Sequence, residues 1–143
     1  MSRDRVITLR GNPMIYEDDN VADGQTLKPG HLINYDSSGD IIKHATAAAA
    51  TKSVALERDE MGDDVDDAYG DGDAVKVGVF GAGMRSTGWI ASGENLVKGA
   101  LLEANGAGGF RALASGVALA RIMETIDYRN VSTADTRVKV EWL

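Results

Sequence analysis

The sequence contains the stretch Gly24-Gln-Thr-Leu-Lys-Pro-Gly30-His-Leu-Ile-Asn-Tyr-Asp-Ser-Ser-Gly39 twice, the second time as a degenerate copy from Gly93 to Gly108. In both copies a Gly is followed by a Leu three residues later, by a Gly at six, by an aliphatic pair at eight and nine, and by a Gly at fifteen. The matching residues are Gly24/Gly93, Leu27/Leu96, Gly30/Gly99, Leu32/Leu101 and Gly39/Gly108. Chance similarity is the alternative, since Gly, Ala and Val are abundant. A true repeat determines the architecture, so we expect two similar halves.

Downstream, the offset between the copies shortens from 69 to 63 residues. Residues 54–56 (Val-Ala-Leu) then align with residues 117–119, and residues 75–77 (Val-Lys-Val) align with residues 138–140. A six-residue difference in one loop would explain the change. The sequence therefore predicts halves at about residues 21–80 and 90–143.

The chain length favours one folded unit. A chain of 143 residues can bury one substantial core but hardly two independent ones. We therefore expect a single β-rich domain over residues 15–143, preceded by an N-terminal arm over residues 1–14. No apolar run approaches the ~20 residues of a membrane helix, so no membrane partner is expected. The absence of cysteine excludes disulfides, thiolate metal sites and a cysteine nucleophile.

The charge is acidic, with a formal net value of −7. A general nucleic-acid binder needs a basic face to displace counterions from phosphate, so direct nucleic-acid binding is not expected. The acids are mostly Asp (15 Asp, 7 Glu) and the bases mostly Arg (9 Arg, 6 Lys). This bias fits a protein that works in concentrated salt, where hydrated carboxylates maintain solubility, or simply an acidic protein.

Short apolar segments separated by glycines predict a mainly β fold with little helix. A hairpin is expected over residues 32–43 and strands over residues 53–57, 74–80, 84–90 and 136–143, with Trp142 in the core. A Gly-rich β-turn should join residues 74–80 to residues 84–90. Residues 116–127 fit either a helix face or an alternating strand. The expected architecture is a compact β-tulip or β-barrel-like domain.

The N-terminal segment is the only locally basic part of the chain. Arg3, Arg5 and Arg10 surround the short apolar run of residues 6–9. It could be an arm that orders on a partner as an added strand, or it could be a frayed terminus or the first strand of the domain.

No motif indicates catalysis, and we expect no enzyme and no catalytic, cofactor-binding or metal-binding residue. His31 and His44 could approach across the hairpin and bind a metal with Asp36, or they could be surface residues. The acidic residues 59–73 do not match the EF-hand spacing, which leaves a solvated loop or a different calcium site. The glycines at residues 81–83 lack the rest of a dinucleotide-binding motif.

Aromatic residues suggest a second class of function. Trp89, Tyr35 and Tyr69 could each form a stacking platform for a sugar ring. A small-ligand or glycan-binding β module, possibly displayed on a virion, is therefore the alternative to a structural role.

A series of short motifs runs in order through nearly the whole chain. They are Val21-Ala-Asp-Gly24, Leu27-Lys-Pro-Gly30, Ser53-Val-Ala-Leu-Glu57, Asp66-Asp-Ala-Tyr-Gly-Asp-Gly-Asp-Ala-Val-Lys-Val77, Gly93-Glu94 with Lys98-Gly99, Ala118-Leu-Ala-Arg-Ile-Met-Glu-Thr-Ile-Asp127 and Thr136-Arg-Val-Lys-Val140. In this order they resemble the capsid decoration (cement) proteins of tailed viruses, of the lambda head-decoration type.

The resemblance implies a β-tulip or barrel fold, a homotrimer, and a place on the outer surface of the virion capsid. It implies binding to the major capsid protein through an N-terminal arm, no catalytic residues, and stabilisation of the shell. The residues that would contact the capsid are Arg3, Arg5, Val6, Ile7, Leu9 and Arg10. Together with the Asp and Arg bias, it suggests a virus of a salt-loving host.

Overall fold

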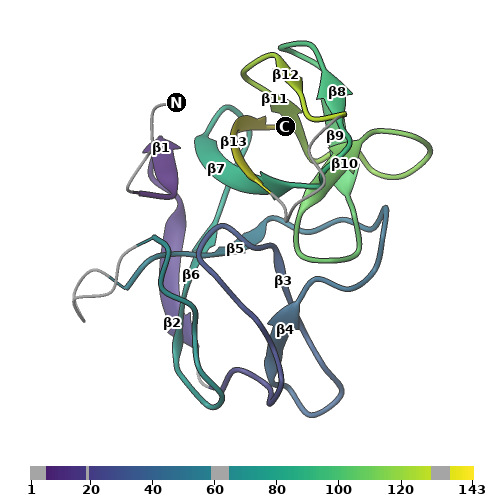
Figure 1. Ribbon diagram of the computed structural model, residues 1–143. Helices are drawn as coiled ribbons and strands as arrows, with labels where there is room; N and C mark the ends of the chain where they lie inside the picture. The colour runs from purple at the N-terminus through teal and green to yellow at the C-terminus, as the bar shows by residue number, and fades with distance from the viewer. Residues whose placement is uncertain (1–5, 19, 59–64, 130–135) are drawn as a thin grey trace.

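The protein is all-β. The computed structural model describes residues 6–18, 20–58, 65–129 and 136–143, and no helix occurs among them, so none there could cross a membrane. The first strands lie in the lower part of Figure 1 and the later strands in the upper part, except that β1 lies beside the upper group. The strands of the described residues are β1 (Thr8–Arg10), β2 (Met14–Asp18), β3 (Ile33–Tyr35), β4 (Ile41–Lys43), β5 (Ser53–Ala55), β6 (Val75–Val79), β7 (Arg85–Ile90), β8 (Asn95–Leu96), β9 (Leu101–Ala104), β10 (Phe110–Ala112), β11 (Ala120–Ile122), β12 (Ile126–Asp127) and β13 (Thr136–Trp142).

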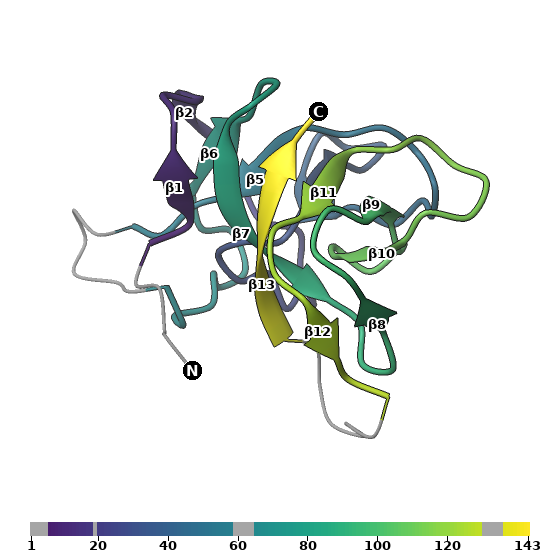
Figure 2. The same ribbon diagram turned by 90° about the horizontal axis from the view of Figure 1, so that it is seen from above.

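The second half of the chain forms a closed five-stranded barrel. Its strands follow the order β7-β10-β9-β11-β13, and β13 pairs back to β7 over six residues from Thr136–Ile90 to Glu141–Arg85. Figure 2 shows these strands surrounding a common interior. β1 adds to the outer edge of β7 as a sixth strand. Closure removes the free edges that an open sheet of this size would expose. The prediction of a mainly β, barrel-like domain is confirmed.

The first half follows the same path in a less regular form. β2, β6 and β5 form one sheet and β3 and β4 form a hairpin. The isolated bridges Leu32–Val54 and Val21–Ile41 connect the two. The same connections occur in the second half as the antiparallel pair Leu101–Arg121 and the parallel pair Ile90–Phe110. Strands β2, β6, β5, β3 and β4 therefore correspond to β7, β13, β11, β9 and β10.

The hydrogen bonds of the two halves also correspond. At the hairpin turns, one side-chain oxygen accepts two backbone N–H groups in each half. The bonds run from Ser38 and Asp40 to Asp36 Oδ1, both at 2.9 Å, and from Ala107 and Gly109 to Asn105 Oδ1, at 2.8 and 3.0 Å. The three repeated glycine pairs share positive φ, which only glycine adopts readily. Their φ values are 80° and 90° at Gly24 and Gly93, 94° and 98° at Gly30 and Gly99, and 85° and 80° at Gly39 and Gly108.

One part of the sequence alignment is wrong. β6 and β13 correspond at the predicted offset of 63, because Ala55 pairs with Val77 where Ile122 pairs with Val140. Val54, however, corresponds to Arg121 and not to Val117, since each bridges the equivalent Leu of the preceding strand. The offset at β5 is thus 67, so the length difference between the halves is divided between two loops.

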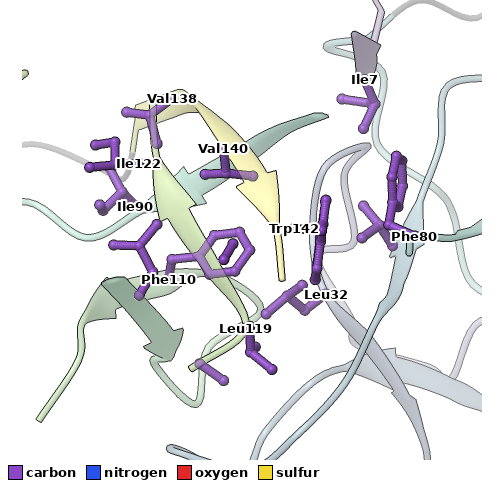
Figure 3. Close-up of a cluster of buried hydrophobic side chains, with 14 of the residues drawn as sticks. Ile7, Leu32, Phe80, Ile90, Phe110, Leu119, Ile122, Val138, Val140 and Trp142 are labelled. Atoms are coloured by element: carbon purple, nitrogen blue, oxygen red, sulfur yellow. The ribbon is translucent and has the colours of Figure 1, made fainter. Parts of the chain in front are cut away.

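The two halves share one large core. Trp142, at the end of β13, is stacked on Phe80 of the first half, with ring centroids 5.5 Å apart and planes at 13°. Phe110 meets the same indole edge-on at 5.6 Å and 64°. Leu32 and Ile7 from the first half and the N-terminus also belong to this cluster, which Figure 3 shows around Trp142. The predicted burial of Trp142 is confirmed, since its side chain is 1% exposed.

A second, smaller core fills the first half. It contains the repeated Leu27, the hairpin residues Ile33 and Ile41, and buried side chains of β6. Its members are Val21, Leu27, Ile33, Ile41, Ala55, Tyr69, Val75 and Val77.

The glycine-rich turn between the halves forms as predicted but closes no hairpin. Met84 N–H donates to Gly81 O at 3.1 Å, and Gly83 has a φ of 83°. The strands on either side, β6 and β7, pair with different neighbours. β6 lies between β2 and β5, whereas β7 has β13 on one side and both β1 and β10 on the other. The turn therefore links one half to the other.

We expect Gly88→Ala to destabilise the protein by about 1–3 kcal/mol, the usual cost of overpacking a core. A Cβ at Gly88 would lie 2.4 Å from Cε2 of Phe110, which is already held against Trp142. Gly81→Ala is the matched control, because its Cβ would meet only Met84 Cε at 3.6 Å. Denaturant unfolding should show a lower midpoint for Gly88→Ala and a change within about 0.5 kcal/mol for the control. Equal stability of the two variants would contradict this account of the core.

Candidate interaction surface

The predicted N-terminal arm is partly packed on the domain. Arg3 and Arg5 lie outside the described residues. β1 pairs with β7 in an antiparallel manner, with Thr8 opposite Ser86 and Arg10 opposite Arg85. For residues 8–10 the structure therefore supports the alternative of a first strand, and β2 already begins at Met14.

Ile7 anchors this segment. Its side chain is fully buried in the large core. Its N–H donates to Glu57 Oε2 at 3.1 Å and its carbonyl accepts the Thr87 N–H at 2.9 Å. Ile7 thus presents no side-chain surface for the predicted capsid contact, and Leu9 is only partly exposed. Val6 and Arg10 are the exposed members of the predicted set.

Apolar side chains are exposed around the start of the described chain. Met14 is 72% exposed, Ile15 52% and Val6 47%. A shallow recess of about 300 Å³ lies between β1 and β2, and its lining includes Val6, Pro13 and Ile15 with Glu57 and Lys76. Val6 and Ile15 line this same recess, and exposed apolar groups gathered at one place commonly mark an interaction surface.

Arg10 belongs to a cluster of three arginines around one carboxylate. Glu141 Oε2 lies 3.3 Å from Arg10 Nη2 and 2.9 Å from Arg85 Nε, and its Oε1 lies 3.8 Å from Arg121 Nε. The hydrogen bond from Arg85, followed by the charges of the three arginines, lowers the pKa of the Glu141 carboxyl. Three guanidinium groups face one carboxylate, so the cluster carries an excess of positive charge on an otherwise acidic protein.

Sequence reasoning identified Arg10 but missed Arg85 and Arg121. They lie on β7 and β11, and only the pairing of these strands with β1 and β13 brings the three together. Apolar and polar residues alternate along residues 136–142, which places Glu141 on the polar face of the strand. This alternation is the one feature of the sequence that points to the cluster.

Both histidines are buried inside the domain. His31 is 7% exposed, and its Nδ1 accepts the Lys28 N–H at 2.9 Å. Burial, helped by the nearby charges of Lys43 and Lys28, lowers the pKa of His31 to about 3. His44 is 2% exposed, and burial lowers its pKa as well. Within the described ranges, no three His, Asp or Glu side chains lie close enough to hold a metal ion.

Three of the described acids within residues 59–73 form hydrogen bonds or ion pairs inside the protein. Asp71 Oδ1 accepts the Gly24 N–H at 3.1 Å, and Asp73 Oδ2 accepts the Gly70 N–H at 2.8 Å. Asp66 pairs with Arg137. The acids within residues 59–64 lie outside the described residues.

The three predicted stacking aromatics have different environments. Tyr69 is 4% exposed and its hydroxyl donates to Leu56 O. Trp89 contacts the His31 ring at 5.2 Å, and the Arg137 guanidinium lies 5.2 Å from its centroid. Tyr35 is 41% exposed, with its hydroxyl 3.0 Å from that of Tyr16. Only Tyr35 combines substantial exposure with a polar neighbour suitable for a sugar.

Glu103 is the one carboxylate that the described residues bury completely. It accepts the Arg111 side chain at 2.8 and 3.1 Å and the Ala114 and Gly116 N–H groups at 2.5 and 3.2 Å. The hydrogen bond from Ala114, followed by that from Arg111, lowers the pKa of its carboxyl from 4.5 to about 2. With both oxygens engaged, Glu103 orders the loop after β10.

Compared with known proteins, the chain matches no protein-family model and no curated protein.

We expect Glu103 to make the free energy of unfolding depend on pH in the acid range. Its folded pKa of about 2 lies below the 4.5 of an unperturbed Glu, so its contribution is complete above pH 4.5 and is lost as the pH falls towards 2. Glu103→Gln should therefore be less stable than the wild type at pH 7, with a difference that shrinks between pH 4.5 and 2. Urea unfolding at several pH values measures this. A difference that does not change with pH would refute the assignment.

Proposed function

We propose that the protein decorates the outer surface of a tailed-virus capsid and stabilises the shell. The proposal starts from the ordered sequence motifs that resemble capsid decoration proteins. The barrel fold is compatible with it. The expected partner is the major capsid protein, and the expected location is the virion.

The observation that carries the proposal is the surface around β1. Exposed Val6, Met14 and Ile15 lie near the N-terminus of the domain, and the arginine cluster of Arg10, Arg85 and Arg121 surrounds Glu141 on the neighbouring strands. Apolar contacts can supply affinity there, and an excess of positive charge can select an acidic surface on a partner. Val6 and Arg10 of this surface belong to the segment that the resemblance assigns to capsid binding.

The mechanism would be mechanical. A homotrimer presents three copies of this surface at once, so that the second and third contacts form at high effective concentration. A modest affinity for each shell subunit then becomes a firm attachment across several subunits. Many such trimers would hold neighbouring subunits together against the pressure of the packaged genome.

A glycan-binding module remains the second candidate, and one observation favours it. The exposed Tyr35 ring and the Tyr16 hydroxyl lie at the same place on the surface. A glycan array with the purified protein distinguishes this candidate, because binding that Tyr35→Ala abolishes would favour it over a purely structural role.

We expect Arg10→Glu combined with Arg121→Glu to weaken attachment to purified, expanded shells of the encoding virus by at least about tenfold at low salt. The changes convert an excess of positive charge into an excess of negative charge, and rim charges act mainly through complementarity. Co-sedimentation of the protein with shells measures the effect. Arg129→Glu is the control, because Arg129 lies outside the cluster and pairs with Asp127. Equal losses in both variants would contradict a role for the cluster.

We also expect shells that carry the protein to survive heating longer than bare shells. Each trimer would add contacts between subunits, which slows their separation. Light scattering during a temperature ramp follows shell disruption. Identical survival of decorated and bare shells would refute the proposed function.

A further inference from the structure

Because the fold is duplicated, each strand of one half can be compared with the equivalent strand of the other half. β2 pairs with β6 as β7 pairs with β13: Ile15 lies opposite Gly78 where Arg85 lies opposite Glu141. The offset between β2 and β7 is 70 residues, so Glu17 corresponds to Thr87. What happens on the far side of β7 can therefore be compared with the far side of β2.

The edge of β7 that faces away from β13 is covered by β1 at its start and by β10 at its end. Thr87 N–H donates to Ile7 O at 2.9 Å, and Thr8 lies opposite Ser86. No strand among the described residues occupies the corresponding edge of β2, which pairs with β6 alone. β2 lies at the margin of the lower part of Figure 1. The edge of β7 thus pairs with β1, whereas the equivalent edge of β2 has no partner strand among the described residues.

The backbone groups of β2 are oriented for pairing. Lys76 O accepts the Leu56 N–H of the β5 side at 2.8 Å, and so it points away from β2. Glu17 lies opposite Lys76, so the two form a pair without mutual hydrogen bonds. The N–H and C=O groups of Glu17 therefore point outward, as those of Thr87 do where β1 binds.

The edge of β2 is only partly protected. Natural edges carry charged side chains, Lys above all, or Pro or a bulge. The charges of β2 stand only at its C-terminal end, at Glu17 and Asp18, no Lys or Pro lies within residues 14–18, and β2 pairs with β6 without a register shift. Met14 and Ile15 are also the two most exposed large apolar residues near this edge.

We propose that an extended segment of the partner adds to the outer edge of β2 as an antiparallel strand, as β1 adds to β7. This segment carries apolar side chains beside Met14 and Ile15 and a basic side chain beside Glu17. The identity of the partner as the shell protein rests on the proposed function, whereas the open edge rests on the structure alone.

Charge favours such a partner over a second copy of this chain. In an antiparallel pairing of β2 with another β2 centred on Tyr16, each Glu17 would lie opposite an Ile15, which leaves the carboxylate without a cation. In a parallel pairing the two Glu17 side chains would repel each other. An antiparallel strand places its first residues beside Glu17 and its last residues beside Met14. A strand with a basic residue followed by apolar residues, in the order of the chain's own Arg5-Val-Ile-Thr-Leu9, therefore matches both ends of β2.

The test follows backbone amide exchange of the full-length protein with two probes. One is a synthetic peptide of the sequence Arg5-Val-Ile-Thr-Leu9 with blocked ends, and the other is the purified expanded shell. We expect each to slow exchange at Ile15 and Glu17 by at least about tenfold relative to the protein alone. Glu17→Pro should abolish this protection, because proline removes the outward N–H and is tolerated where a strand edge faces solvent. Ser37→Pro, in the exposed hairpin turn, is the control.

The outcomes separate the two proposals. Attachment to shells without protection of β2 overturns the strand addition and leaves the proposed function standing. Protection by the peptide without attachment to shells upholds the open edge and overturns the shell as partner. Absence of protection with both probes overturns the inference. Concentration-dependent protection of β2 without any probe, together with dimers in sedimentation, would show that a second copy is the occupant and would overturn it as well. A thermal midpoint of Glu17→Pro close to that of Ser37→Pro shows that the variant is folded.

Discussion

The stacking of Trp142 on Phe80 is the contact on which the rest of the structure depends. The indole comes from the last strand of the chain and the phenyl ring from the end of the first half, 62 residues earlier in the sequence. Phe110, which belongs to the barrel of the second half, packs against the same indole. Because these rings occupy one core, the large core is complete only when both halves are in place. The two similar halves are therefore joined through this shared core, beside which the first half keeps a smaller core of its own.

The barrel of the second half closes only when β13 pairs with β7, and this pairing also positions the charged surface. Glu141 and Arg85 face each other in the register of these two strands, Arg121 arrives on β11, and Arg10 arrives on β1. The positive cluster is therefore a product of barrel closure. The buried Trp142 is the next residue after Glu141, so core packing and surface charge are linked through one short segment of backbone.

The two halves share a path but differ in what surrounds them. The second half is regular, closed and covered on its outer edge by β1, whereas the first half closes through isolated bridges and keeps β2 at an edge. Duplication accounts for the common hydrogen bonds at the turns. The position of β1 breaks the symmetry, since one segment can cover only one of two equivalent edges. The difference between the halves is therefore as informative about binding as their similarity is about folding.

The sequence alone determined the local features of this protein. Alternation predicted β6 and β13 and the burial of Trp142, while repeated glycines marked turns that need positive φ. These properties depend on neighbouring residues, which a sequence displays directly. The register of Val54 with Arg121, the burial of Ile7 and the meeting of Arg10, Arg85 and Arg121 were decided only by the tertiary structure. Each depends on strands that lie far apart in the chain. In addition, loops of different length shift the alignment between the two halves, and no local sequence pattern shows where this shift occurs. Long-range strand pairing, and not the character of any one segment, selects which side chains share a core and which share a surface.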